Sequence, residues 1–339
     1  MTSLSRRSTL GLLCSAAVIR SVRGEPRVLI DSVGRHVAAP ERPGRVLSAG
    51  PPASILIYAL APEALLGWVP APSAEAKAFL LPAARDLPAS PRLTSRGEAT
   101  DIAAIAALKA DLIVDFGSIA SNYVTLAEKV QGGAHVPYAL IDGRLDKLPA
   151  SLRLAGDLLG RRERAEALAR YAEQSLAHLD SVVSKAPVDR RPRVFVARGP
   201  DGLQSAVKGS PLTEVVERAG AVNVAEGTPG RGGAIDATVA QLVAWKPDFV
   251  VALDKGAHDA MRKTAPAGAR VLGTPTLPWN WLGEPPSLNR LMGLRWLASA
   301  LYPVGPKTEL RAEAREFHRL FYGVAPSDAE LAALLEGAG

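Results

Sequence analysis

One helix-to-strand element occurs twice in this chain, and this duplication limits the fold more than any other feature. The segment IAALKADLIVD over 105–115 is answered by LVAWKPDFVVA over 242–252, an offset of 137 residues. A second match, RVLSA over 45–49 with RVFVA over 193–197, has an offset of 148 residues. Single αβ units often look alike, but two matches in the same order at similar offsets predict two related units in tandem. We therefore expect two lobes with a cleft between them.

Within each lobe the order of apolar segments predicts a parallel sheet. In the first lobe a β-like run over 45–49 leads through a loop into an apolar helix over 55–60. A helix over 102–109 then leads into a strand over 111–116, and the second lobe repeats this order from residue 193 onward. Helices that alternate with short, continuously apolar strands are typical of a parallel sheet covered on both faces. The sequence therefore predicts an α/β protein.

A long helical pattern separates the two lobes. Over 149–186 there is no Gly-Pro break, and apolar residues recur at helical spacing. A helix of roughly 35 residues would be about 50 Å long, enough to cross a two-lobed protein. We expect one connecting backbone helix over 149–186, between an N-terminal α/β lobe over 25–148 and a C-terminal α/β lobe with a helical tail over 187–339.

Residues 1–24 have the layout of a twin-arginine export signal. Arg6 and Arg7 stand just before a short apolar run over 11–19, which is too short to span a bilayer permanently. Cys14, the only cysteine, lies in this run and lacks the small preceding residues of a lipidation motif. We expect cleavage after Gly24 and a soluble periplasmic product without a thiol.

The charge of the processed chain argues against nucleic acid as a partner. Loss of residues 1–24 removes four arginines and no acid, which lowers the formal net charge from +6 to +2. No basic stripe interleaved with aromatic residues compensates for this loss.

The usual catalytic motifs are missing from the sequence. There is no Gly-x-Ser-x-Gly elbow, no Walker loop and no Gly-x-Gly-x-x-Gly after a strand, so we expect neither an enzyme nor a bound cofactor. An exported α/β enzyme would need a nucleophile or paired carboxylates, which the sequence does not indicate. No two of the five histidines stand at metal-ligand spacing, so no metal held by protein side chains is expected; they are His36, His135, His178, His258 and His318.

Two loops carry candidate anion-binding arginines. Arg231 lies in a Gly-rich loop over 227–233 ahead of a predicted helix, and the first-lobe counterpart over 94–98 carries Arg96. Both loops are expected at the carboxyl edges of the sheets, where open α/β folds bind ligands. A flexible surface loop is the alternative interpretation.

Aromatic residues give a second group of candidates. Trp279 and Trp281 stand together in a loop bounded by proline, in a chain that is only 5% aromatic. Clustered indoles can stack on a flat or bulky ligand, and Trp68 in the first lobe could line the same cleft. The alternative is a hydrophobic plug that packs the C-terminal helices onto the lobe.

Taken together, four segments resemble the substrate-binding proteins of ABC importers for iron–siderophore and cobalamin-type ligands. They are RVLSAGPPAS over 45–54, the twin LKADLIV and WKPDFVV elements, the long connector, and PPSLNRLMGLRWL over 285–297 with the following LYP. The likeness covers nearly the whole processed chain. It implies two Rossmann-like lobes joined by one rigid backbone helix, a ligand held between them, little lobe motion and docking on a membrane permease.

The resemblance also implies docking residues. Members of this family usually present one acidic side chain on each lobe, and those positions fall at or near Ala103 and Ala240. Asp101 and Asp236, at the starts of the same two predicted helices, are the candidate replacements. The missing acids leave open an exported scaffold or sensor that has lost permease docking.

We therefore expect a monomeric periplasmic protein that captures a chelated metal, such as a ferric siderophore, for ABC import. Haem or a corrinoid is the closest alternative ligand. The expected ligand-binding residues are cations that neutralise an anionic chelate, together with apolar and aromatic residues that cover it: Arg96, Arg198, Arg231, Lys255, Pro52, Trp68, Phe116, Trp279 and Trp281.

Overall fold

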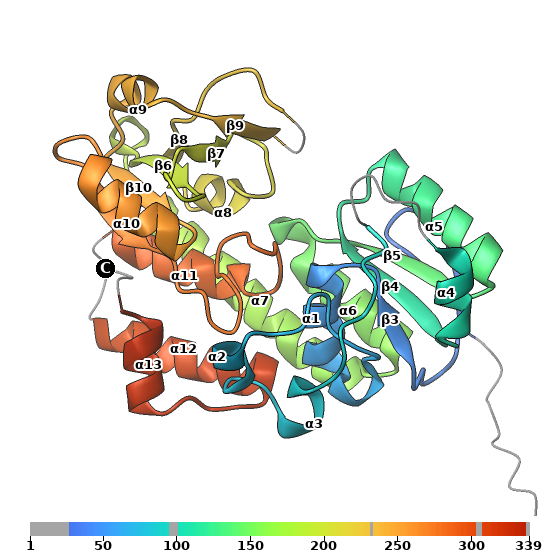
Figure 1. Cartoon of the computed structure of the whole chain (residues 1–339). Helices are drawn as coiled ribbons and strands as arrows, with labels where there is room; N and C mark the ends of the chain where they lie inside the picture. The colour runs from blue at the N-terminus through green and yellow to red at the C-terminus, as the bar shows by residue number, and fades with distance from the viewer. Residues whose placement is uncertain (1–26, 95–100, 231–232, 303–306, 337–339) are drawn as a thin grey trace, which may run out of the picture.

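Two α/β lobes stand side by side, with a long helix running between them (Figure 1). This computed structural model describes residues 27–94, 101–230, 233–302 and 307–336. The predicted export signal therefore lies outside the described residues. Within them, no helix combines the length and the apolar character needed to cross a membrane.

The N-terminal lobe is built on a three-stranded parallel sheet, in the order β3-β4-β5. Alternate residues of β4 face opposite layers, because Val114 packs with α1 and α6 whereas Ile113 packs with α4 and α5. The expected parallel sheet with two covered faces is confirmed. The bounds are β3 Val46–Ser48, β4 Leu112–Gly117, β5 Tyr138–Asp142, α1 Pro51–Leu60, α4 Ile102–Ala107, α5 Ser121–Ala134 and α6 Leu148–Leu159.

A short hairpin protects the open edge of this sheet. β1 (Arg27–Ile30) and β2 (His36–Ala39) are antiparallel, and their turn lies against β5. The Ser32 N–H donates to the Leu140 carbonyl at 2.9 Å, and the Asp31 carboxylate accepts the Leu140 N–H at 3.2 Å. The turn thus occupies β5 groups that a further strand would use.

The C-terminal lobe repeats the plan with a four-stranded parallel sheet, in the order β11-β10-β6-β8, and a small antiparallel β7-β9 ribbon. Helices α9 and α10 cover one face, and α8 and α11 pack on the other. The bounds are β6 Arg193–Ala197, β7 Gln204–Ala206, β8 Val222–Asn223, β9 Ala234–Asp236, β10 Phe249–Ala252, β11 Arg270–Gly273, α8 Glu214–Arg218, α9 Val239–Trp245, α10 Lys255–Thr264 and α11 Arg290–Leu301.

The duplication seen in the sequence is repeated in the hydrogen bonds. After α4 and α9 the chain turns through lysines in the left-handed conformation, Lys109 at φ 49° and Lys246 at φ 45°. The guanidiniums of Arg45 and Arg193 each donate to the last two carbonyls of these turns, at 2.8 and 3.1 Å in one lobe and at 2.7 and 3.2 Å in the other. The backbone N–H of each arginine also donates to the carboxylate of the aspartate two residues beyond the lysine, Asp111 or Asp248. The two lobes therefore share one structural unit.

The helical connector differs from the single helix expected over 149–186. It comprises α6 and α7 (Arg162–Val183), which meet at Gly160, a residue with φ 65°. Arg153 on α6 pairs with Glu166 and Glu173 on α7, both at 2.7 Å, so the two helices pack side by side. A Cβ on Gly160 would lie 2.4 Å from the Glu41 carbonyl oxygen, so a glycine is needed there. The fold class is confirmed, but the long helix is α7 alone, about 33 Å in length.

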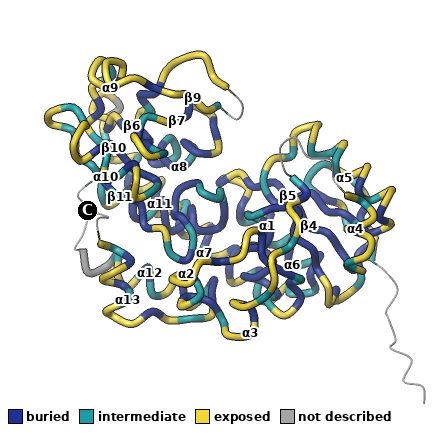
Figure 2. The backbone as a smooth tube through the Cα atoms, in the orientation of Figure 1, coloured by how far each residue is buried: buried dark blue, intermediate teal, exposed yellow. Residues whose placement is uncertain are grey.

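The C-terminal tail spans both lobes instead of capping only the second. Tyr58 on α1 donates its hydroxyl hydrogen to the Tyr322 carbonyl at 2.7 Å, at the end of α12. Buried segments run without interruption from one lobe to the other (Figure 2). The remaining helices are α2 Ala74–Lys77, α3 Pro82–Arg85, α12 Lys307–Tyr322 and α13 Asp328–Leu334, with 3₁₀ turns at 62–64, 145–147 and 188–190.

Candidate ligand-binding site

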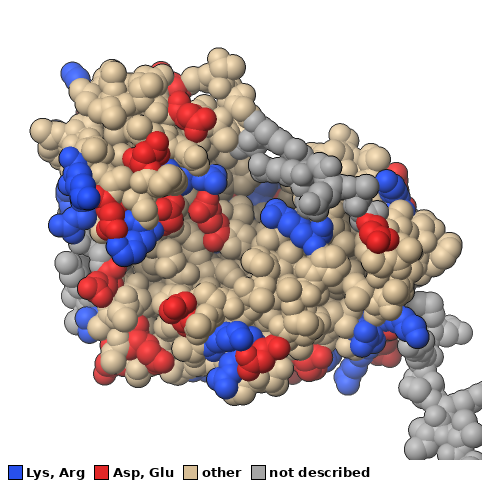
Figure 3. Space-filling view, viewed as in Figure 1, with Lys and Arg blue, Asp and Glu red and all other residues tan. Residues whose placement is uncertain are grey.

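A hollow opens between the two lobes on the face shown in Figure 3. Acidic and basic side chains both gather on the C-terminal lobe's part of this face. Loops that follow the strands of each sheet meet residues of the opposite lobe. Trp279, after β11, packs at a tilt against Trp68, and the carbonyl of Gly143, after β5, accepts a hydrogen bond from Arg290. We call this depression the inter-lobe hollow.

Four aromatic residues pack together where the two lobes meet. The Trp279 ring lies 4.9 Å from the Trp68 ring and 5.8 Å from that of Tyr322, and Tyr58 lies 5.2 Å from Trp68, all between centroids. Trp68 is fully buried, and its Nε1 donates to the Ala84 carbonyl at 2.7 Å. The prediction that Trp68 lines the cleft is therefore not supported by its burial, whereas Trp279 is partly exposed.

Two asparagines that the sequence reasoning missed hold the Trp279 loop. Asn280 donates to the Leu253 carbonyl at 2.7 Å and accepts the Leu282 and Gly283 N–H groups. Asn289 donates to the Trp279 carbonyl at 2.7 Å. Their signal in the sequence is a pair of amides within an apolar stretch, since buried amides must find partners.

The second loop tryptophan behaves as the plug that was the alternative interpretation. Trp281 is fully buried in the main core cluster. Its Nε1 has no hydrogen-bond partner among the described residues. Phe116, also predicted to contact ligand, is only 2% exposed and packs in the same cluster. Pro52 lies half-buried in the first turn of α1.

Two of the predicted cations of the C-terminal lobe, Arg198 and Lys255, are already ion-paired. Arg198, directly after β6, lies 3.2 Å from the Glu284 carboxylate. Burial raises the pKa of Glu284. The charge of Arg198 opposes this rise, and the charge of Asp254 adds to it. Lys255 has a side chain that is 86% exposed and pairs with Asp259 one turn further along α10. Arg96 and Arg231 lie outside the described residues.

Two further buried groups have shifted pKa values, Asp115 in the N-terminal lobe and His318, whose ring lies 5.6 Å from that of Tyr322. Asp115 on β4 is 5% exposed and accepts the Tyr138 hydroxyl at 3.1 Å, in the layer between the sheet and α5. Burial raises the pKa of Asp115 to about 6. Burial also lowers the pKa of His318 on α12, whose Nδ1 lies 2.7 Å from the Ala314 carbonyl oxygen.

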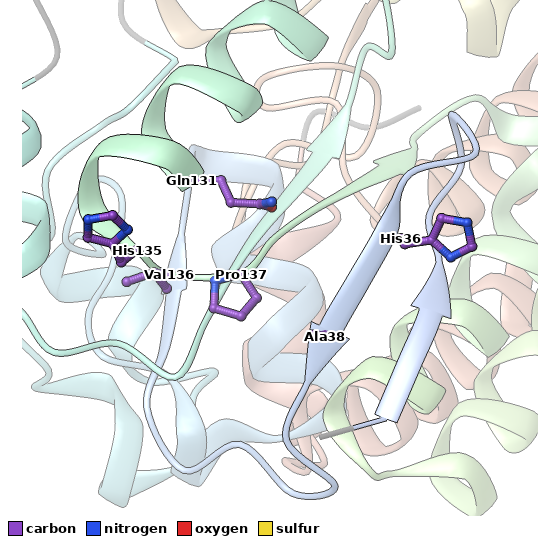
Figure 4. A pocket seen from close by; sticks show the side chains of 6 residues that line it. All are labelled: His36, Ala38, Gln131, His135, Val136 and Pro137. Carbon is purple, nitrogen blue, oxygen red and sulfur yellow. The ribbon is translucent and has the colours of Figure 1, made fainter. Parts of the chain in front are cut away.

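The described residues hold no cluster of three or more side chains able to bind a metal ion. A groove of about 300 Å³ on the N-terminal lobe is lined by His36 of β2 and by Gln131 and His135 at the end of α5. Figure 4 shows that the two imidazoles lie on opposite sides of this groove, on separate elements. Their placement does not form a ligand set.

The family can be assigned from the chain's similarity to a known group. Residues 76–277 match the family described as periplasmic binding protein, which is more than half of the chain. The chain belongs to this family. Such binding proteins are non-enzymatic components of ABC import that bind a small-molecule ligand and dock on a permease. No curated protein is similar enough to match.

Solved structures agree with this assignment. An ABC transporter solute-binding protein from Sulfurospirillum deleyianum is 25% identical, with a TM-score of 0.82 over 91% of this chain and 99% of that one. The molybdate-bound MolA of Haemophilus influenzae is 19% identical, with a TM-score of 0.65 over 89% and 99%. A haem-binding protein from Pseudomonas aeruginosa is 24% identical, with a TM-score of 0.57 over 78% and 94%. The last two show the shared fold.

For this periplasmic binding protein the predicted docking acids occupy unlike places. Asp101 is the N-cap of α4, where its carboxylate accepts the Ala104 N–H at 3.0 Å. Asp236 is exposed but ends β9, two residues before Thr238 caps α9. Ala103 and Ala240 are both exposed. The expectation that both acids stand at helix starts thus holds for Asp101 only.

Proposed function

We propose that this periplasmic binding protein holds a chelated metal, of the ferric siderophore type, in the inter-lobe hollow and delivers it to an ABC permease. The observation that carries the proposal is Trp279, a partly exposed indole fixed from behind by Trp68 and Tyr322. A ring held in this way can cover the apolar part of a bulky ligand without losing conformational freedom on binding.

Charge gives the second part of the proposal. An oxygen-rich anionic chelate would exchange its own oxygens for the Glu284 carboxylate at Arg198, and Arg96, Arg231 and Lys255 would add further positive charge. The raised pKa of Glu284 favours this exchange, because a protonated carboxyl competes less for the guanidinium. Anionic chelates are therefore expected to bind more tightly as the pH falls toward the pKa of Glu284.

Tryptophan fluorescence titration tests the ligand class. The probes are ferric tris-catecholate, a ferric trihydroxamate, hemin and each chelator without iron. We expect binding of at least one ferric chelate, weakened roughly tenfold in Trp279→Leu, which is about 1.4 kcal/mol. Trp245→Leu is the matched control, because Trp245 packs on Phe195 in the C-terminal lobe. Equal affinity in Trp279→Leu and the parent protein would remove Trp279 from the site.

A flat tetrapyrrole is the second candidate ligand, and the same indole favours it. Trp279 presents an aromatic surface on which haem or a corrinoid ring can stack. The hemin arm of the titration separates the two candidates, since hemin binding without ferric-chelate binding would favour the tetrapyrrole.

Export and docking complete the proposal. We expect Arg6→Lys with Arg7→Lys to keep the protein in the cytoplasm, measured by cell fractionation, as a twin-arginine route requires.

Permease docking would use Asp101 and Asp236, and Asp101→Asn with Asp236→Asn should then lower ligand-stimulated ATPase activity of the reconstituted importer. Unchanged stimulation would favour other docking residues, and no stimulation by the parent protein would favour a scaffold or sensor.

A further inference from the structure

Arg290 is a fully buried arginine with no part in the proposed ligand contacts. It is the first residue of α11, and its side chain is 2% exposed. All three of its nitrogens have partners: Nε donates to the Ser287 carbonyl at 3.2 Å, Nη1 to the Glu214 carboxylate at 2.5 Å, and Nη2 to the Gly143 carbonyl. A guanidinium fork therefore joins three separate segments.

These partners belong to both lobes. Glu214 opens α8 of the C-terminal lobe, and its second carboxylate oxygen accepts the Leu145 N–H of the N-terminal lobe at 2.9 Å. Gly143 directly follows β5, and its N–H donates to the Gly117 carbonyl at the end of β4, at 2.8 Å. The Arg290–Glu214 pair is thus bonded to the loop that follows β5, and through Gly143 to the end of β4.

The residue before Arg290, Asn289, holds a loop of the C-terminal lobe. Asn289 donates to the Trp279 carbonyl and accepts the Tyr322 hydroxyl. Two consecutive buried side chains at the start of α11 therefore fix a loop of each lobe, Trp279 on one side and Gly143 on the other. The hydrogen bonds leave little room for one loop to move independently of the other.

We propose that the Arg290–Glu214 pair sets the separation of the loops at Gly143 and Trp279, which we take as the two walls of the inter-lobe hollow, and so the size of ligand that fits between them. Arg290 is in this sense a positioning residue that does not touch the ligand. The effect on ligand size rests on the proposed function, whereas the effect on wall separation does not.

Arg290 is buried and the Glu214 side chain is 27% exposed, so an ion pair between them is poorly suited to a purely stabilising role. Removing a charged side chain from water costs about as much as the attraction of its partner returns, so replacing such a pair with apolar residues is often neutral for stability. What the pair supplies is geometry, because a fork with three fixed acceptors permits one arrangement. Replacing both members together therefore tests position separately from folding.

The test compares a double variant, which carries both Glu214→Met and Arg290→Met, with the parent chain. Cys14→Ser removes the native cysteine, and Glu128→Cys on α5 and Lys263→Cys on α10 provide exposed spin-label sites in different lobes. Without ligand, we expect the double variant to unfold cooperatively but to show a broader, shifted distance distribution by double electron–electron resonance. Arg153→Met, which breaks a surface ion pair within the connector, is the matched control and should leave the distribution unchanged.

An unchanged distribution in the double variant overturns the proposal, whatever the ligand is. The single variant Arg290→Lys keeps the charge but loses the fork, so it should give an intermediate distribution. For whichever of ferric tris-catecholate, ferric trihydroxamate and hemin binds the parent chain, the double variant should bind about tenfold more weakly, because only a fraction of molecules keeps the competent separation. If no probe binds the parent chain while the distance change occurs, the proposed function fails and the positioning role stands.

Discussion

The effect of Asp115→Asn on the free energy of unfolding should depend on pH. Compared with the parent chain, the variant should be more stable above neutral pH than it is in acid. The pKa of Asp115 is raised from its usual 3.8 to about 6 by burial, with the Tyr138 hydroxyl bond opposing the shift. A folded-state pKa above the unfolded one contributes stability that is complete below pH 3.8 and is lost as pH rises through about 6. This rise in the pKa corresponds to roughly 3 kcal/mol of folding free energy.

The assay is urea unfolding of both proteins at about pH 4 and pH 8. An amide at position 115 still accepts the Tyr138 hydroxyl but adds an unpaired buried N–H₂, a cost of about 1–3 kcal/mol that does not depend on pH. The informative quantity is therefore the variant-minus-parent difference, which should rise by roughly 2–3 kcal/mol between the two pH values.

The control is Asp86→Asn, an exposed aspartate whose pKa is lowered by its hydrogen bond with Lys77. Its variant-minus-parent difference should change little, and in the opposite direction. A difference for Asp115→Asn that stays constant between pH 4 and pH 8 would refute the reasoning, because it would mean that the buried carboxyl ionises as it does in the unfolded chain.

Three further predictions concern stability. Burial lowers the pKa of His318 from 6.5, so the neutral imidazole's contribution to stability is present above pH 6.5 and is lost as the pH falls. The free energy of unfolding of His318→Gln minus that of the parent chain should therefore rise between pH 7.5 and pH 5 in urea unfolding. A constant value would count against this prediction. Arg45→Ala and Arg193→Ala should each lower the free energy of unfolding by about 1–3 kcal/mol, and by similar amounts, because each arginine caps the end of one helix. A large difference between the urea midpoints of the two variants would contradict the shared structural unit. Gly160→Ala should lower the free energy of unfolding by about 1–3 kcal/mol, because its Cβ would stand in a left-handed turn and clash with the Glu41 carbonyl oxygen. An unchanged thermal midpoint would show that the turn can move to avoid the clash.

The fold could be predicted because its evidence is local in the sequence. The twin segments ending in Lys109 and Lys246 show the repeat directly, and their turns and hydrogen bonds prove equivalent. The connector was overestimated because α6 and α7 each bury one face, so the helical pattern continues across Gly160 while the chain reverses. Sequence periodicity does not distinguish one long helix from two packed ones.

The candidate site was less predictable because it depends on partners far apart in the chain. Trp68 and Trp281 stand in loops, but packing against remote segments buries both. The sequence predicts Arg198 as a ligand contact, yet Glu284 pairs with it from 86 residues away. The burial of a loop indole and the pairing of a loop cation are set by tertiary packing, which composition and spacing do not record.

The contact between α1 and α12 bears on the order in which the molecule can be assembled. Tyr58 donates to the Tyr322 carbonyl, and Arg164 on α7 donates to the Leu320 carbonyl at 3.3 Å. Helix α12, which is synthesised after the strands of both sheets, therefore completes the packing of the first lobe. An N-terminal lobe still attached to the ribosome exposes the surface of α1 that α12 will cover. The N-terminal lobe therefore reaches its final packing only after α12 has been synthesised.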